Sequence, residues 1–202
     1  MNKKEQSKIT FDHHAKKYDQ TIVYKNPRNN YHKILQMLDT LEFANVLDVG
    51  CGTGEMLRLI SEKYNSVEAY GIDLSDEMIK IAKAKLSPDI NLFVGDSEHL
   101  PFSDETFEVL LCMESFHHYP NPDNVLKEFK RVLKPNGVLF ICDMWRVFPL
   151  RNIMSLAMKF LPTGDVKIYS KREIVKFVKE AGFSNIIYEQ ISWVAYNVKC
   201  EK

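Results

Sequence analysis

The sequence predicts an α/β fold: a mostly parallel, seven-stranded sheet with helices on both faces and an antiparallel C-terminal strand. Short apolar runs alternate with longer segments whose apolar residues recur at helical spacing, and this alternation is typical of parallel sheets. The last two apolar runs have almost nothing between them, so their strands must run antiparallel. We expect residues 1–202 to form a single domain, since this length is ordinary for one.

Seven apolar runs are predicted to be strands. They cover residues 46–49, 67–72, 91–94, 107–113, 138–142, 185–191 and 192–198. The intervening helices have recognisable ends. Ser75 is the expected N-cap of one helix, Pro122 stands in the first turn of another, and Ser170 with Glu173 forms a capping box at the start of a third. Residues 134–137, with the sequence Lys-Pro-Asn-Gly, are predicted to form a turn.

Composition excludes several classes of protein. The 27 basic residues equal the 27 acidic ones, and this balance argues against a dedicated nucleic-acid binder, which usually carries excess positive charge. No apolar run approaches the roughly 20 residues that cross a bilayer, and the polar start lacks a secretory signal. The four scattered cysteines show neither a disulfide framework nor a zinc site. We therefore expect a cytoplasmic protein with no membrane span.

The segment from Val46 to Gly54, VLDVGCGTG, combines a short strand with a glycine-rich turn. Such a turn lets a ligand approach the backbone, and the following helix offers free N–H groups. The dinucleotide fingerprint Gly-x-Gly-x-x-Gly is broken, because Gly54 comes one residue early. Asp48 would also repel a pyrophosphate. A zwitterionic methionine moiety fits better, with its carboxylate near backbone N–H groups and its ammonium near Asp48.

Two further acids follow the next two predicted strands. Asp73 lies 21 positions after Gly52, which is where a ribose diol is bound in folds of this type. Asp96 follows the third strand and can accept a hydrogen bond from an adenine amine, while Ser97 can supply a backbone N–H to the ring. The carboxyl ends of parallel strands meet at one edge of the sheet, so we expect these groups to converge there.

These motifs, in order and correctly spaced, resemble the class I S-adenosylmethionine (SAM)-dependent methyltransferases. The segments are VLDVGCGTG, then Gly-Ile-Asp-Leu-Ser (71–75), then Gly-Asp-Ser-Glu-His-Leu-Pro-Phe (95–102), then Leu-Lys-Pro-Asn-Gly-Val-Leu (133–139), with Phe-Asp-His-His-Ala-Lys-Lys-Tyr-Asp (11–19) as an N-terminal helix. Within that family they are closest to the small-molecule group that includes the ubiquinone and menaquinone C-methyltransferases, the type 11 methyltransferases. The resemblance implies a Rossmann-like fold, SAM as cofactor and S-adenosylhomocysteine as product.

The resemblance also implies a set of cofactor contacts and a division of the chain. The expected cofactor-binding residues are Tyr18, Asp48, Gly50, Cys51, Gly52, Asp73, Leu74, Met78, Asp96, Ser97 and Met113. Residues 1–40 would form N-terminal lid helices and 41–143 the SAM-binding core. Residues 144–169 form a variable, Met-rich apolar segment, which is either an acceptor lid or a helix packed on the sheet or in a dimer contact. Residues 170–202 would supply the last helix and the strand pair.

His117 and His118 follow the fourth predicted strand, where the family meets its acceptor. Either imidazole can act as a general base near neutral pH, although both have an ordinary alternative in packing and backbone hydrogen bonding. The Asn/Asp-Pro-Pro-aromatic motif of nucleic-acid amine methyltransferases is absent here, so we expect a small-molecule acceptor and no nucleic acid. We expect no metal: adjacent residues do not easily share one ion, and no third ligand has suggestive spacing.

The leading hypothesis is a SAM-dependent methyltransferase acting on a small molecule, with a homodimer as a further expectation. A second class of function remains open: the chain could be a catalytically silent SAM-binding regulator or partner subunit. A fold alone does not prove that a protein catalyses a reaction. An NAD(P)-linked oxidoreductase is disfavoured by the missing third-glycine position.

Overall fold

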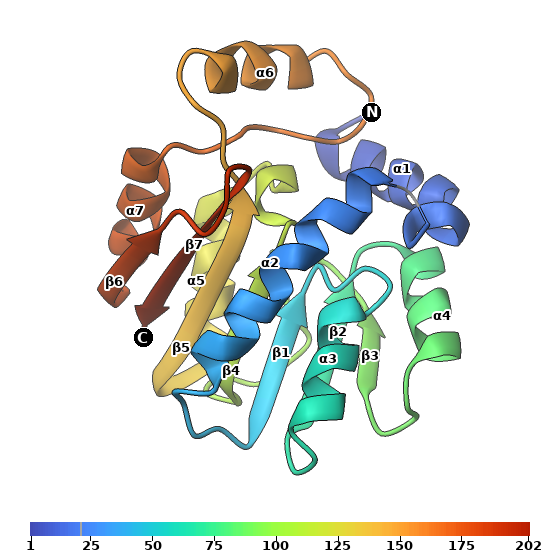
Figure 1. Ribbon diagram of the computed structural model, residues 1–202, viewed down its shortest axis with the longest axis vertical. Helices are drawn as coiled ribbons and strands as arrows, with labels where there is room; N and C mark the ends of the chain where they lie inside the picture. Colours follow the sequence, from blue (N-terminus) through green and yellow to red (C-terminus); the bar gives the residue numbers. More distant parts are fainter. Residues whose placement is uncertain (21) are drawn as a thin grey trace.

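A computed structural model describes residues 1–20 and 22–202 (Figure 1), with the side chains of residues 1–20 and 30–202. The seven strands are β1 (Asn45–Val49), β2 (Glu68–Asp73), β3 (Asn91–Val94), β4 (Phe107–Met113), β5 (Leu133–Met144), β6 (Ser184–Glu189) and β7 (Ala195–Glu201). The helices are α1 (Lys3–Tyr18), α2 (Ile22–Leu38), α3 (Glu55–Lys63), α4 (Asp76–Lys85), the 3-10 turn η1 (Phe116–His118), α5 (Pro122–Val132), α6 (Leu150–Met158) and α7 (Lys171–Glu180).

The strands form one sheet in the order β3-β2-β1-β4-β5-β7-β6. β1 to β5 run parallel, while β7 is antiparallel to both of its neighbours, β5 and β6. The fold class predicted from the sequence is therefore confirmed. The strand order reverses between β1 and β4, and in open α/β sheets ligands bind at the carboxyl ends of the strands on either side of such a point.

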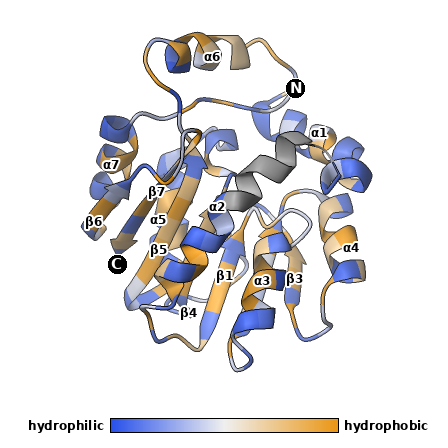
Figure 2. Cartoon of the chain, viewed as in Figure 1, coloured by the Kyte–Doolittle hydropathy of each residue, from blue (hydrophilic) through white to orange (hydrophobic). Residues whose placement is uncertain are grey.

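Two apolar layers bury the two faces of the sheet. On one face, residues of α5 and α7 pack against the strands around Phe129 and Ile174. On the other, residues of α2 and α3 pack around Ile34, Leu57 and Phe140. Figure 2 shows β1, β4 and β5 mostly in the hydrophobic colour, as expected for central strands covered on both sides.

The predicted helix starts are confirmed by hydrogen bonds. Ser75 Oγ accepts from the backbone N–H of Met78, and Ser170 with Glu173 forms the complete capping box at α7. α5 begins at Pro122. One cap was not predicted: Asn2 and Glu5 form a second capping box at the start of α1.

The predicted turn at 134–137 is instead part of β5, and this expectation was wrong in detail. Phe107 pairs with Leu133 and Val109 pairs with Val138, so six residues of β5 oppose three of β4. The extra residues bulge from the ladder, and Asn136 has a left-handed φ of 62°. β5 thus starts earlier than the apolar run because a bulge absorbs the polar residues.

α6 lies beyond the strand ends, apart from the sheet (Figure 1). Ser155 and Met158 are buried, whereas Leu150, Ile153 and Leu156 are exposed. The exposed side chains of α6 therefore do not pack on the sheet, which was one of the alternatives for residues 144–169. Among the described residues, no helix combines the length and the apolarity that crossing a membrane requires.

Candidate active site

A cavity lies at the carboxyl ends of the strands on the β1 side of the sheet, and α1 closes it. Its lining includes Tyr18, Gly50, Cys51, Gly52, Asp73, Leu74, Met78, Asp96, Ser97 and Met113. These are ten of the eleven residues expected to contact a cofactor. They come from separate parts of the chain because parallel strands deliver their following loops to one edge.

The eleventh residue, Asp48, does not line this cavity. It lies in β1 and is 1% exposed, and its Oδ1 has no hydrogen-bond partner. Desolvation, with the charge of Asp73 as a second cause, raises the pKa of this carboxyl to about 8. An unpartnered buried carboxyl is costly when ionised. Asp48 therefore needs either a proton or a cation close to the glycine loop.

The glycine loop is held by its own backbone. Gly50 and Cys51 donate N–H bonds to Ile72 O at 2.8 and 3.1 Å, and Gly54 donates to Cys51 O at 2.9 Å. Gly52 donates to Asp73 Oδ2 at 2.8 Å. These four N–H groups are thus already used within the protein, whereas the sequence led us to expect loop N–H groups facing a carboxylate. α3 has no side-chain N-cap, so first-turn N–H groups remain for that task.

Two glycines of this loop are required for different reasons. Gly50 has φ +77°, and a Cβ there would lie 2.5 Å from Ser115 Oγ. Gly52 has φ +53°, but a Cβ there would meet no atom within 4 Å. Gly50 is therefore needed for packing. Gly52 faces open space within the cavity and leaves that space for a ligand.

Asp73 braces the loop as well as facing the cavity. Its Oδ2 accepts from Gly52 and its Oδ1 accepts from the backbone N–H of Ser75 at 2.9 Å. Each carboxylate oxygen has two lone pairs, so both retain capacity for a diol. The position predicted for ribose recognition is therefore preorganised by two backbone bonds.

α1 is tied across the cavity by charged contacts. Lys4 Nζ lies 2.7 Å from Asp96 Oδ2 and 2.8 Å from Glu98 Oε1. Lys8 pairs with Asp12 and Asp76. The Asp96 oxygen expected to receive an adenine amine thus has a lysine partner, which the sequence did not indicate. Lys4, Ser7, Lys8 and Phe11 form the α1 side of the cavity.

A second cavity adjoins the first. Phe11, Tyr18, Tyr31, Glu114 and His118 line both. Its remaining walls are Thr10, His14, His117, Met144, Arg146, Met158, Thr163, Asp165 and Val194. The apolar segment 144–169 supplies several of these residues.

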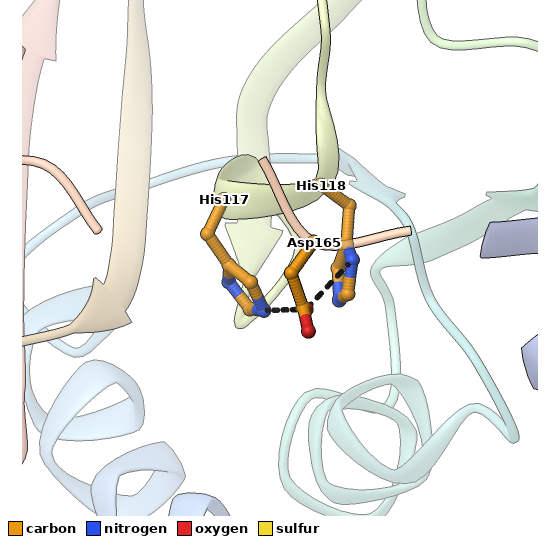
Figure 3. Close-up of side chains that lie close together, drawn as sticks. All are labelled: His117, His118 and Asp165. Atoms are coloured by element: carbon orange, nitrogen blue, oxygen red, sulfur yellow. Dashed lines mark ion pairs between the residues drawn. The ribbon is translucent and has the colours of Figure 1, made fainter. Parts of the chain in front are cut away.

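The two histidines have different environments (Figure 3). His117 Nδ1 lies 2.6 Å from Asp143 Oδ1. Burial lowers the pKa of His117, but the negative charge and hydrogen bond of Asp143 raise it by more, so that the pKa is about 9. Burial, with repulsion from His117, lowers the pKa of His118 to about 3. A base is most effective when its pKa is near the working pH. Neither ring meets that condition, so the predicted base role is not favoured by these environments.

Glu114 is a further candidate for acid–base chemistry at this site. It lines both cavities and has a left-handed φ of 53°, which is strained for a non-glycine residue. Burial raises the pKa of its carboxyl to about 8, with repulsion from Asp143 as a further cause. The signal in the sequence was only its place directly after a buried strand.

Comparison with known proteins supports the interpretation of this site. Residues 47–141 match the family model described as a methyltransferase domain. A demethylmenaquinone methyltransferase of Thermotoga maritima is 28% identical over 198 residues, covering 86% of each chain. Residues 47–141 therefore carry the domain of the SAM-dependent methyltransferases.

Other relatives and solved structures agree. The phthiotriol/phenolphthiotriol dimycocerosates methyltransferase of Mycobacterium tuberculosis is 35% identical, over 57% of this chain and 43% of its own. The putative methyltransferase solved in complex with the Haloferax volcanii Trm112 activator has a TM-score of 0.79 at 21% identity, covering 96% of each chain. An Aquifex aeolicus SAM-dependent methyltransferase has a TM-score of 0.69 at 24% identity, over 85% of this chain and 89% of that one. At these identities the two structures establish the fold.

The residues of this methyltransferase suit SAM. The open space at Gly52 accommodates ligand atoms close to the backbone, and Asp73 offers acceptors for a diol. The methionine ammonium of SAM would supply the cation that an ionised Asp48 needs near the loop. The cavity thus offers open space beside the loop, acceptors for a diol and negative charge, which are the features that SAM requires.

Proposed function

We propose that this methyltransferase transfers the methyl group of SAM to a small molecule bound in the second cavity. The observation that carries the proposal is the shared wall: five residues, including Glu114 and His118, line both cavities. A donor in the first cavity and an acceptor in the second would therefore meet at this wall. Cofactor binding by the ten lining residues and by Asp48 is part of the same proposal.

SAM supplies a methyl group activated by a sulfonium. The protein contributes mainly alignment, because well-oriented reactants can gain roughly 7–11 kcal/mol over free ones. Phe11, Tyr18 and Tyr31 line both cavities and place three aromatic rings at the junction. Phe11 packs edge-on against the His118 ring at 5.0 Å between centroids, which fixes both rings.

We assign proton transfer to Glu114. An acceptor hydroxyl or activated carbon that must lose a proton needs a base at the junction, and a carboxyl whose pKa is about 8 exchanges protons near neutral pH. His117 and His118 then position the acceptor, replacing the base role that their sequence position suggested.

The second cavity indicates an acceptor with an apolar body and a polar group. Met144, Met158 and Val194 provide apolar surface, and methionine adapts to irregular shapes. His117, His118 and Asp165 form a polar cluster, and Arg146 adds a positive charge. The demethylmenaquinone methyltransferases among the relatives make a hydroxylated aromatic ring the first acceptor class to test.

A partner-dependent role is the second candidate. The structural neighbour with a TM-score of 0.79 was solved with a methyltransferase activator. The exposed apolar residues Leu150, Ile153, Leu156 and Phe160 provide a surface for a partner or for the expected homodimer. In this case the purified chain would bind SAM and remain silent alone.

The test measures S-adenosylhomocysteine release by mass spectrometry, with SAM and a panel of hydroquinones, phenols and amines. We expect turnover with at least one hydroxylated aromatic acceptor, and at subsaturating SAM a rate at least about tenfold lower with Gly52→Ala. Tight SAM binding without product on any acceptor would overturn the proposal in favour of the silent partner. A cytoplasmic location, favoured by four free buried cysteines, belongs to the same proposal.

A further inference from the structure

His117, His118 and Asp165 bring three metal-ligand atoms together at the wall of the second cavity (Figure 3). Asp165 Oδ1 lies 3.6 Å from His117 Nε2 and 3.2 Å from His118 Nδ1, and all three ligand atoms lie within 4.8 Å of one another. Ligands of a tetrahedral zinc ion, at 2.0–2.2 Å from the metal, lie about 3.4 Å apart. The cluster is thus close to the spacing that one ion requires.

The ligand at His117 is oriented by a carboxylate behind it. Asp143 contacts His117 Nδ1 at 2.6 Å and accepts the backbone N–H of the same residue at 2.8 Å. This leaves His117 Nε2 turned toward Asp165. Histidines that bind metals almost always hold their other nitrogen in this way, which fixes the ring and strengthens the ligand.

The His118 atom facing Asp165 has no hydrogen bond. Its Nδ1 is buried and unpartnered, although the Asp165 oxygen is only 3.2 Å away. The geometry between the two atoms is therefore not that of a hydrogen bond. A cation between the imidazole nitrogen and the carboxylate would satisfy both groups at once.

Asp165 is held in place by its own loop, which is fastened to η1. Thr163 Oγ1 donates to Asp165 Oδ2 at 2.5 Å, which leaves Oδ1 for the cluster. Val166 and Lys167 donate backbone N–H bonds to His117 O at 2.9 and 3.3 Å. The loop after α6 is thereby fastened to η1, and the third ligand is supplied without any sequence spacing that would announce it.

We propose that His117 Nε2, His118 Nδ1 and Asp165 Oδ1 bind one divalent transition-metal ion of the zinc type. Two imidazoles and one carboxylate are borderline ligands that suit Zn²⁺, Fe²⁺ or Co²⁺ and leave positions open. All three residues line the second cavity, so an ion held by them would be reached from it. The ion therefore takes an oxygen of the acceptor and holds it beside the junction, a role that rests on the function proposed above.

The test is ion retention, measured without any acceptor. The protein is loaded with Co²⁺ and desalted, and bound metal is counted by elemental analysis and by the visible absorption of the ion. We expect one Co²⁺ per chain with no thiolate band, since the four cysteines are buried elsewhere. Asp165→Asn and His118→Gln should lower the affinity at least about tenfold. His13→Gln, on an exposed part of α1, is the matched control and should retain the ion.

Folding of each variant is checked by its melting curve, and for Asp165→Asn also by its SAM affinity, because Asp165 lines only the second cavity. Asp143→Asn tests the positioning role and is expected to weaken Co²⁺ binding about 10–100-fold. Failure of the wild type to retain the ion would overturn the proposal, as would retention unaffected by Asp165→Asn and His118→Gln. Either result leaves SAM turnover untouched, so it is distinguishable from failure of the proposed function.

Discussion

Replacing Asp48 by Asn is expected to stabilise the ligand-free protein increasingly as the pH rises. Asp48 is fully buried, its Oδ1 has no partner, and its pKa is raised to about 8 by desolvation and by Asp73. The folded state thus binds this proton more tightly than the unfolded state does. The resulting stabilisation is present below the unfolded pKa near 4 and is lost as the pH rises through 8.

The size of the effect follows from the two pKa values. A carboxyl that ionises near pH 8 instead of 3.8 disfavours folding by roughly 5 kcal/mol once it is fully ionised. Even a part of this, roughly 2 kcal/mol, moves the Tm of a chain of this length by about 4–8 °C. Asn is neutral at every pH and escapes the penalty. Tyr31, Cys51, Asp73 and Cys112 are titratable groups that interact with the charge of Asp48, and all are unchanged in the variant.

The assay is a series of melting curves for both proteins between pH 5 and 8.5 without ligand. We expect the Tm of Asp48→Asn minus that of the wild type to grow across this range, while SAM affinity falls because the ammonium loses its counter-charge. A Tm difference that stays constant with pH would refute the reasoning, because the pKa of Asp48 would then be the same in the folded and the unfolded state.

Three further predictions concern the site. Gly50→Ala should destabilise the fold by about 2–5 kcal/mol, because of backbone strain and the clash with Ser115. Gly52→Ala should destabilise it by only about 1–2 kcal/mol and yet lower SAM affinity at least about tenfold. Melting curves and calorimetry measure the two effects, and equal losses of stability would contradict the distinction. Asp73→Asn replaces one acceptor oxygen by a donor, and a lost hydrogen bond to a charged group costs about 1.5–3 kcal/mol. The Kd for SAM should therefore rise tenfold or more. An unchanged Kd would count against ribose recognition by Asp73. Glu114→Gln should reduce kcat by ~10²–10⁴-fold with SAM affinity little changed, and a kcat close to that of the wild type would remove Glu114 as the base.

The sheet and the first cavity were predictable from local patterns. Apolar runs marked the strands, and Asp73 and Asp96 follow strands whose carboxyl ends share an edge, so their convergence required only the parallel order. The turn predicted at 134–137 failed because a bulge accommodates polar residues inside a strand, and an apolar run does not reveal register.

Contacts between distant segments were not predictable. Lys4 reaches Asp96 across 92 positions, and Asp165 reaches His117 only because the loop after α6 returns to η1. The adjacent rings of His117 and His118 both contact Asp165 because the 3-10 turn brings their centroids to 4.0 Å. The spacing rule that disfavoured a shared ion assumes ligands close in sequence, and this cluster takes its third ligand from elsewhere.

The most direct test of the two-cavity arrangement is a crystal structure with S-adenosylhomocysteine bound. We predict that the ribose contacts Asp73, the adenine lies beside Asp96 and Ser97, and the sulfur faces the shared wall at Glu114 and His118. A sulfur turned away from this wall, or an adenine in the second cavity, would contradict the account.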